Sequence, residues 1–263
     1  PRVFSSLVWT APWKTPASCG IWPSCIWGCS VAETDPDGLT PADRSGWLDE
    51  DAAATAPDWL APVVDVVRRV SPEDLSLFLP PSSGGRLGAV LMLFGEGPSG
   101  PDLLIIERAR DMRSHPGQPA FPGGAADAED DHLVRTALRE ANEETGLDPD
   151  GVQVLGALPA LWLPPSGFVV SPVIGWWRQP SPVSAHAPEE VASVHRVPWS
   201  ELLDPARRVW VRHPMGYVGP GFQVRELLVW GFTGGLISQL FASAGLERPW
   251  EPAPTVDLPE WAT

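Results

Sequence analysis

The stretch GGAADAEDDHLVRTALREANEETGL, residues 123–147, joins a double glycine to a helix that carries three glutamates. Its apolar residues recur at the i, i+3, i+4, i+7 spacing of one helical face: Val134, Ala137, Leu138 and Ala141. Glu140, Glu143 and Glu144 fall within an arc of roughly 100° beside that stripe. The three carboxylates therefore share one face of a helix that Gly146 is expected to end as its C′ residue.

Like charges at this spacing repel on an isolated helix, so a folded chain that gathers them usually offsets them with a cation or an arginine. Carboxylate oxygens without histidine or cysteine beside them suit Mg²⁺ or Mn²⁺ better than zinc. The alternative is a solvated acidic face, which is ordinary for glutamate-rich helices. The wider spacing pattern argues against that alternative.

The stretch resembles the Nudix box, Gly-x5-Glu-x7-Arg-Glu-U-x-Glu-Glu-x-Gly-U, where U is aliphatic. Residues 139–147 match every fixed position of its second half, with Ala141 as a small U. The first half departs from the pattern, because Asp130 stands where glutamate is expected and eight residues rather than seven separate it from Arg139. The extra residue is expected to be absorbed in the loop before the helix.

A second resemblance lies upstream. Residues 103–109, LLIIERA, and 113–124, RSHPGQPAFPGG, look like the signature Leu-Leu-Thr-x-Arg-Ser…Gly-Gln-x-x-Phe-Pro-Gly-Gly. That signature accompanies the Nudix box in coenzyme A pyrophosphatases, where the longer loop is also common. Ile106 in place of threonine and Ala109 in place of serine are the departures. Short segments at 163–168, 189–191, 219–222 and 229–234 follow in the order expected for the same group.

The resemblance implies metal-assisted hydrolysis of a diphosphate that is linked on both sides. Glu143 and Glu144 would be the main ligands of Mg²⁺ or Mn²⁺. Glu140 would be a third ligand or would orient the attacking water, and the carbonyl of Gly124 could also reach the metal. Glu190 could act as a general base; a plain surface charge pair with Glu189 is the equally weighted alternative.

Arg139 is expected to be structural, pairing with Asp130 or Glu129 to hold the loop against the helix. Its planar fork should make lysine a poor substitute.

The expected substrate contacts come from the upstream signature: Arg108, Arg113, Gln118 and Phe121. Either arginine could bind the diphosphate or the 3′-phosphate of coenzyme A bidentately, or could be a surface ion-pair residue instead. Phe121 is interpreted first as a core or pocket-wall residue.

Composition limits the class of partner. The 263 residues carry a formal net charge of −15 with a pI near 4.6, which disfavours binding to a nucleic-acid backbone. No apolar run reaches the length of a membrane span. The sequence therefore predicts a cytoplasmic protein whose partner is a small nucleoside diphosphate-type molecule, and it allows for a homodimer.

Three regions are expected along the chain. Residues 1–57 lack helical or strand periodicity and are expected to be irregular and poorly ordered; residues 58–246 would form the Nudix hydrolase domain, and residues 247–263 a Pro-rich tail. The three cysteines, Cys19, Cys25 and Cys29, match no zinc spacing. We hypothesise that residues 1–40 are an over-extended gene start, which peptides detected from them by mass spectrometry would contradict.

Within the predicted domain, helix signals cover 58–70 and begin again at Ser71. Strand signals cover 86–94, 102–108, 152–158, 168–176 and 191–197, and a C-terminal helix is expected to end at Gly245. This mixture predicts an α/β fold with a mixed sheet sandwiched between helices, as Nudix folds have.

Two classes of function remain. The first is a hydrolase that acts on coenzyme A, or on another nucleoside diphosphate derivative such as ADP-ribose or NADH. The second is a Nudix-fold binding or regulatory module without turnover. Intact Glu140, Glu143 and Glu144 favour the enzyme, because a module that only binds has no physical reason to keep all three at metal spacing.

Overall fold

The computed structural model describes residues 46–76, 78–81, 84–112, 115–164 and 166–258. The expectations about the cysteines and the gene start, and the one about Arg113, fall outside these residues. Two sheets and six helices make up the described part of the chain. The larger sheet carries the candidate site.

The larger sheet has nine strands in the order β1-β6-β8-β2-β3-β4, with β5 on β2, β7 on β8 and β9 on β3. Their bounds are β1 Trp47–Leu48, β2 Arg86–Gly97, β3 Gly100–Arg108, β4 Pro119–Ala120, β5 Gly123–Ala125, β6 Val152–Ala157, β7 Leu161–Leu163, β8 Phe168–Trp177 and β9 Val191–Pro198. The central pair β2 and β8 is parallel and the other pairs are antiparallel. Both central strands are covered on two faces, which is why they are apolar runs without alternation.

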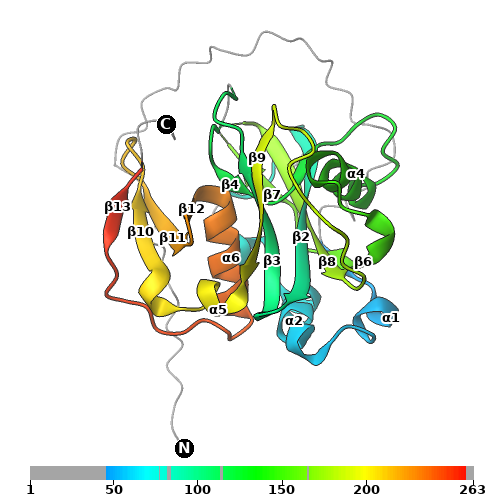
Figure 1. Ribbon diagram of the computed structural model, residues 1–263, viewed down its shortest axis with the longest axis horizontal. Helices are drawn as coiled ribbons and strands as arrows, with labels where there is room; N and C mark the ends of the chain where they lie inside the picture. The colour runs from blue at the N-terminus through cyan, green and yellow to red at the C-terminus, as the bar shows by residue number, and fades with distance from the viewer. Residues whose placement is uncertain (1–45, 77, 82–83, 113–114, 165, 259–263) are drawn as a thin grey trace, which may run out of the picture.

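Helices cover both faces of this sheet. Helix α4 (Leu133–Thr145) packs on one face, while α2 (Ala61–Arg69) and α6 (Gly231–Ser243) pack on the other (Figure 1). Alternate residues of β3 divide between the two cores, because Leu104 faces α4 whereas Leu103 and Ile105 face α2 and α6. The predicted mixed sheet between helices is confirmed.

A second, four-stranded sheet was not predicted. Its order is β12-β11-β10-β13, with bounds β10 Arg208–Arg212, β11 Val218–Val224, β12 Leu227–Val229 and β13 Thr255–Asp257. Phe222 and Val224 of β11 join the core around α6. Strand β13 belongs to the Pro-rich tail, where Trp250 packs on Trp210 at a ring distance of 4.8 Å. The described part of the tail is therefore attached to the fold.

Order begins before residue 58. Residues 47–53, which we expected to be irregular, form β1 and helix α1 (Glu50–Ala53). Trp47 pairs with Ala157 of β6, and the Asp49 side chain caps α1 by accepting a hydrogen bond from the Ala52 N–H at 2.9 Å. A two-residue strand has no periodicity to detect, so its partner strand, not its own sequence, defines it.

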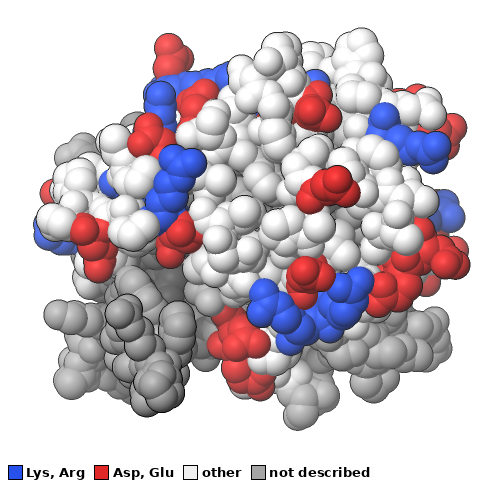
Figure 2. All heavy atoms as spheres, turned by 90° about the horizontal axis from the view of Figure 1, so that it is seen from below, with Lys and Arg blue, Asp and Glu red and all other residues white. Residues whose placement is uncertain are grey.

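The remaining elements are short. Helix α3 (Pro72–Leu75) begins after Ser71 as predicted, with a capping box between Ser71 and Asp74. Helix α5 (Trp199–Leu202) and the 3₁₀ turns η2 Asp58–Leu60, η3 Pro149–Gly151 and η4 Pro205–Arg207 complete the described chain. None of the helices within the described ranges is both long and apolar enough to cross a membrane. On the face seen in Figure 2, acidic and basic side chains of the described residues lie interspersed.

Candidate metal centre

Helix α4 positions the candidate ligands, and its two ends are defined locally. His132 is the N-cap residue, and its Nδ1 accepts a hydrogen bond from the Arg135 N–H at 3.1 Å. At the other end Gly146 adopts φ 70°, the left-handed conformation that glycine tolerates best. The predicted helix and its glycine stop are confirmed.

The loop before α4 is fastened to the helix by Asp130. The Asp130 Oδ2 lies 2.9 Å from Arg139 Nη2 and 2.9 Å from the Thr136 hydroxyl, and it accepts the Asp127 N–H at 3.0 Å. Arg139 also donates to the carbonyl of Ala125 at 3.2 Å. Of the two partners that the sequence left open for Arg139, the structure brings it together with Asp130, as a structural residue.

These contacts change the acidity of Asp130. Its side chain is only 1% exposed, and burial by itself would raise the pKa. The hydrogen bonds from Arg139, the Asp127 N–H and Thr136 outweigh burial and lower the pKa to about 2. Asp130 is therefore a satisfied, ionised carboxylate whose task is to hold the loop.

Glu144 is the most deeply buried of the three glutamates, at 2% exposure. Its Oε2 accepts a hydrogen bond at 2.9 Å from the backbone N–H of Gly123, the first residue of strand β5. Burial raises the pKa of Glu144 to about 8; the Gly123 hydrogen bond and Arg108 lower it, and the charges of Glu140 and Glu190 raise it. Sequence reasoning missed the Gly123 amide as a partner, because a backbone donor leaves no signal in residue type.

Glu140 lies half-buried beside the double glycine. A Cβ on Gly124 would stand 2.5 Å from the Glu140 carboxyl, so a methyl group at this position would displace that carboxyl. Burial raises the pKa of Glu140, Arg139 lowers it, and Glu143 and Glu190 raise it. The chain thus brings the backbone of Gly124 and the carboxylates of Glu140 and Glu144 to one place.

Glu143 has a different environment, since its side chain is 57% exposed. Arg139 Nη1 holds Glu143 Oε2 at 3.1 Å and Glu140 Oε1 at 3.0 Å. Among the residues that the structure describes, no three His, Cys, Asp or Glu side chains are arranged as a ready metal site. The metal-ligand roles of Gly124, Glu140, Glu143 and Glu144 stay predictions.

Glu190 joins the same acidic region from the loop before β9. Its carbonyl accepts the Ala109 N–H at 2.8 Å, which fixes this loop against the end of β3. Its charge raises the pKa of both Glu140 and Glu144. The structure therefore brings Glu190 together with the helix glutamates, while its role as a general base stays a prediction.

Arg108 lies at the end of β3 with its charge acting on Glu144. The buried Nε of its side chain has no hydrogen-bond partner among the described residues. Its backbone N–H donates to the carbonyl of Gln118 at 3.1 Å. Arg108 and Gln118 are therefore neighbours beside the glutamates. Such an unsatisfied guanidinium nitrogen suits an anionic group.

Phe121 lies in the core, which is one of the two places that the sequence allowed for it, and its contact with substrate stays a prediction. Phe121 is 2% exposed and belongs to the core shared with α2 and α6. It packs there because the apolar ring is more stable out of water than at the rim of a charged site.

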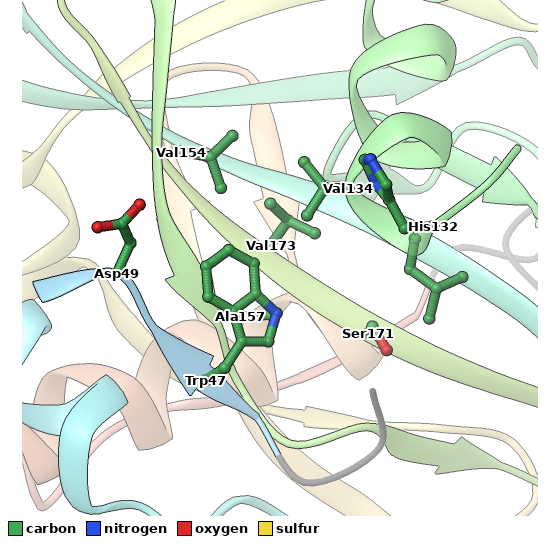
Figure 3. A pocket seen from close by; sticks show the side chains of 9 residues that line it. Trp47, Asp49, His132, Val134, Val154, Ala157, Ser171 and Val173 are labelled. Carbon is green, nitrogen blue, oxygen red and sulfur yellow. The ribbon is translucent and has the colours of Figure 1, made fainter. Parts of the chain in front are cut away.

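The cavity drawn in Figure 3 is a different place. It has a volume of about 360 Å³ and lies beside the N-terminus of α4, where the Trp47 indole faces Val154 and Val173. Its lining residues are Trp47, Asp49, His132, Leu133, Val134, Val154, Ala157, Ser171 and Val173. None of the candidate ligands lines it, so this cavity is not the candidate metal centre.

Comparison with known proteins gives three findings. The family profile described as the NUDIX domain matches residues 85–215. A protein of Enterobacter sp. (strain 638) named "Uncharacterized Nudix hydrolase NudL" is 41% identical over 155 residues, 56% of this chain and 77% of that protein. The protein of the same name from Cronobacter sakazakii is 40% identical over 172 residues, 62% of this chain and 85% of its own length.

A solved structure is also similar. The Nudix hydrolase RenU of M. smegmatis has a TM-score of 0.41 and 18% sequence identity, covering 62% of this chain and 88% of that one.

Proposed function

This chain belongs to the Nudix hydrolase family, and from that premise we propose that it cleaves the diphosphate linkage of coenzyme A or a coenzyme A derivative. As a Nudix hydrolase it is an enzyme of the pyrophosphohydrolase class. The proposed products are 3′,5′-ADP and 4′-phosphopantetheine. The charges and hydrogen bonds around α4 and the end of β3 support the substrate, the cofactor and the residue roles.

One observation carries the proposal: the half-buried carboxyl of Glu140 and the buried carboxyl of Glu144 act on each other, and the charge of Glu190 acts on both. Their pKa values are raised because burial and mutual repulsion disfavour the charged forms. A divalent cation would offset both effects, and oxygen donors suit Mg²⁺ or Mn²⁺. The residues present therefore fit the divalent cation that Nudix hydrolases generally use.

Each residue has a proposed role. Glu143 and Glu144 hold the cation, Glu140 is a third ligand or orients the attacking water, and the carbonyl of Gly124 completes the set. When bound, the cation would clamp phosphate oxygens and make a water a better nucleophile. Glu190, whose charge already reaches Glu140 and Glu144, takes the proton of the attacking water.

The coenzyme A assignment rests on the segment from β3 to β5. It carries the upstream signature, and it sets Arg108 and Gln118 next to each other beside Glu144. Arg108 binds a phosphate oxygen of the substrate through the guanidinium nitrogen that lacks a partner in the described chain. Arg113, outside the described residues, is proposed for the same task. A cytoplasmic location and a homodimer are proposed from the sequence alone.

A hydrolysis panel tests the substrate. Coenzyme A, NADH, ADP-ribose and a nucleoside triphosphate are each incubated with the chain in Mg²⁺, in Mn²⁺ and in EDTA, and the products are separated by chromatography. We expect coenzyme A to show the highest kcat/KM and EDTA to abolish turnover. If ADP-ribose or NADH is cleaved faster, the substrate assignment fails and the family chemistry stands.

A further inference from the structure

A second polar cluster lies on the opposite face of the sheet from Glu144. It consists of Glu107 on β3 with Ser193 and His195 on β9. The register pairs Glu107 with Ser193 and Ile105 with His195, so these side chains project from one face. Ile105 on the same face belongs to the core of α2 and α6, which places the cluster on that side.

The three side chains are joined by hydrogen bonds. The Ser193 hydroxyl donates to Glu107 Oε2 at 2.9 Å and lies 2.6 Å from His195 Nε2. Because a hydroxyl has one proton, the hydroxyl that donates to Glu107 accepts from a proton on His195 Nε2. The Glu107 side chain is 20% exposed, and Ser193 and His195 are partly exposed. The cluster is thus held in place and still reaches solvent.

The cluster and the candidate metal centre share the ends of the same two strands. Arg108 follows Glu107 and acts on Glu144, and its register partner Val191 follows Glu190. Successive residues of a strand face opposite sides, so the thickness of the sheet separates the two sites at the point where the register of β3 and β9 shifts. A substrate that extends beyond its diphosphate can span that distance around the strand ends.

The charges around the cluster select the kind of group that fits. Glu107, Arg225 and Glu226 all act on His195, the last two from the turn between β11 and β12. Arg225 adopts φ 53°, an uncommon conformation for a residue other than glycine, and its guanidinium is engaged with Glu201 at 3.3 Å. Glu107 Oε1 also lies 3.7 Å from Arg110 Nη2, and the Glu107 carboxylate offers an acceptor to an N–H or O–H group of a ligand.

We propose that Glu107, Ser193 and His195 are a specificity site that hydrogen-bonds an uncharged amide or hydroxyl group in the substrate half beyond the cleaved diphosphate. The inference rests on the proposed function, because it assigns one half of the substrate of that same reaction.

Two substrates separate this role from a structural one. Coenzyme A carries amides and a hydroxyl beyond its diphosphate; the n-butyl ester of 3′-phosphoadenosine 5′-diphosphate keeps the diphosphate and lacks them. We expect Ser193→Ala to raise KM for coenzyme A roughly tenfold, the effect of losing one hydrogen bond in a network with a charged partner, and to leave KM for the butyl ester within about twofold. Ser193→Thr, which keeps the hydroxyl, should restore the coenzyme A value.

Glu107→Gln should act in the same direction as Ser193→Ala. The matched control is Glu96→Gln on β2, an exposed glutamate at the other end of the sheet, which should change neither KM. An effect on kcat or KM that is equal for both substrates overturns the specificity role. The loss of a merely structural hydrogen bond would impair the hydrolysis of both substrates alike.

A failure of the proposed function can be told apart from a failure of the specificity site. If the unaltered chain hydrolyses neither substrate, the coenzyme A assignment fails. Binding of pantetheine, measured by saturation-transfer NMR, then tests the specificity site independently of turnover. A weaker pantetheine signal with Ser193→Ala than with the unaltered chain supports the specificity site. Equal signals overturn it.

Discussion

Asp130 and Glu144 are two almost fully buried carboxylates in one short stretch, and they have opposite electrostatic environments. Asp130 receives hydrogen bonds from Arg139, Thr136 and the Asp127 N–H, and its pKa falls to about 2. Glu144 receives the Gly123 N–H and faces other carboxylates, and its pKa rises to about 8.

The comparison shows that burial alone does not decide what a carboxylate does. Burial raises the pKa of both groups, and the donors around each one determine whether the charge is kept. Asp130 has its counter-charge within the chain and serves as an anchor. Glu144 lacks one strong enough, which is what a cation-binding carboxylate requires.

The largest expected effect is on turnover. Glu144→Gln should lower metal-dependent kcat/KM on the order of 100-fold or more, because it removes a proposed ligand. Without metal, the free energy of unfolding of this variant should not decrease, since glutamine can still accept the Gly123 N–H and replaces a buried titratable group with a neutral one. Turnover is measured on coenzyme A, and unfolding by urea titration in EDTA. Glu129→Gln, at an exposed neighbouring residue, is the control. Full activity of Glu144→Gln would contradict the assignment of Glu144 as a metal ligand.

The next effect is on the anchor. Arg139→Lys should lower the free energy of unfolding by about 2–3 kcal/mol. The planar guanidinium donates to Asp130, to the Ala125 carbonyl and to two glutamates at once, whereas a compact ammonium cannot reach all of them. Arg135→Lys is the matched control on the same helix; Arg135 is exposed and stands 3.8 Å from Asp130, so its change should stay within about 0.5 kcal/mol. Equal losses in the two variants would remove the special role of Arg139.

The pH dependence sharpens the contrast. Folding lowers the pKa of Asp130, so its stabilisation is present above the unfolded pKa of about 3.9 and is lost as pH falls through about 2. Asp130→Asn should therefore be less stable than the unaltered chain by about 2 kcal/mol at pH 6, with the difference shrinking between pH 4 and pH 2. Urea titrations at several pH values measure this. A difference that stays constant with pH would contradict it.

The smallest effect concerns the approach of β5 to the helix. Gly124→Ala should displace the Glu140 carboxyl and lower kcat/KM roughly tenfold, as a misplaced catalytic group does. Gly235→Ala on α6 has open space around the added carbon and should leave kcat/KM unchanged. If Gly124→Ala is as active as Gly235→Ala, the close approach of Gly124 has no part in catalysis.

Local signals predicted α4 well, because amphipathic spacing and a glycine stop act within a few residues of the chain. The local pattern also indicated that Arg139 pairs with an acidic residue of the loop. Glu190 was named as a candidate general base from the resemblance alone. The second sheet escaped prediction because β11 contains Pro220 and two glycines, which weaken the strand signal. Strand β1 escaped because two residues have no period.

Site residues divided in the same way. Phe121 was expected in the core or in a pocket wall, and it lies in the core with α2 and α6. The cluster of Glu107, Ser193 and His195 was not foreseen, since 86 residues separate Glu107 from Ser193 and only strand pairing brings them together. Nothing in the spacing of either segment alone indicates it.

The sequence by itself determined that three glutamates share one helical face behind a double glycine, because side-chain direction on a helix is a local property. Only the tertiary structure decided that Glu144 is buried, Glu140 half-buried and Glu143 exposed. It also decided that Asp130 is hydrogen-bonded to its counter-charge, Arg139, whereas the charge of Arg108 acts on Glu144 without outweighing burial. The reason is that desolvation and Coulomb interactions depend on everything packed around a group, and those neighbours come from strands far away in the chain.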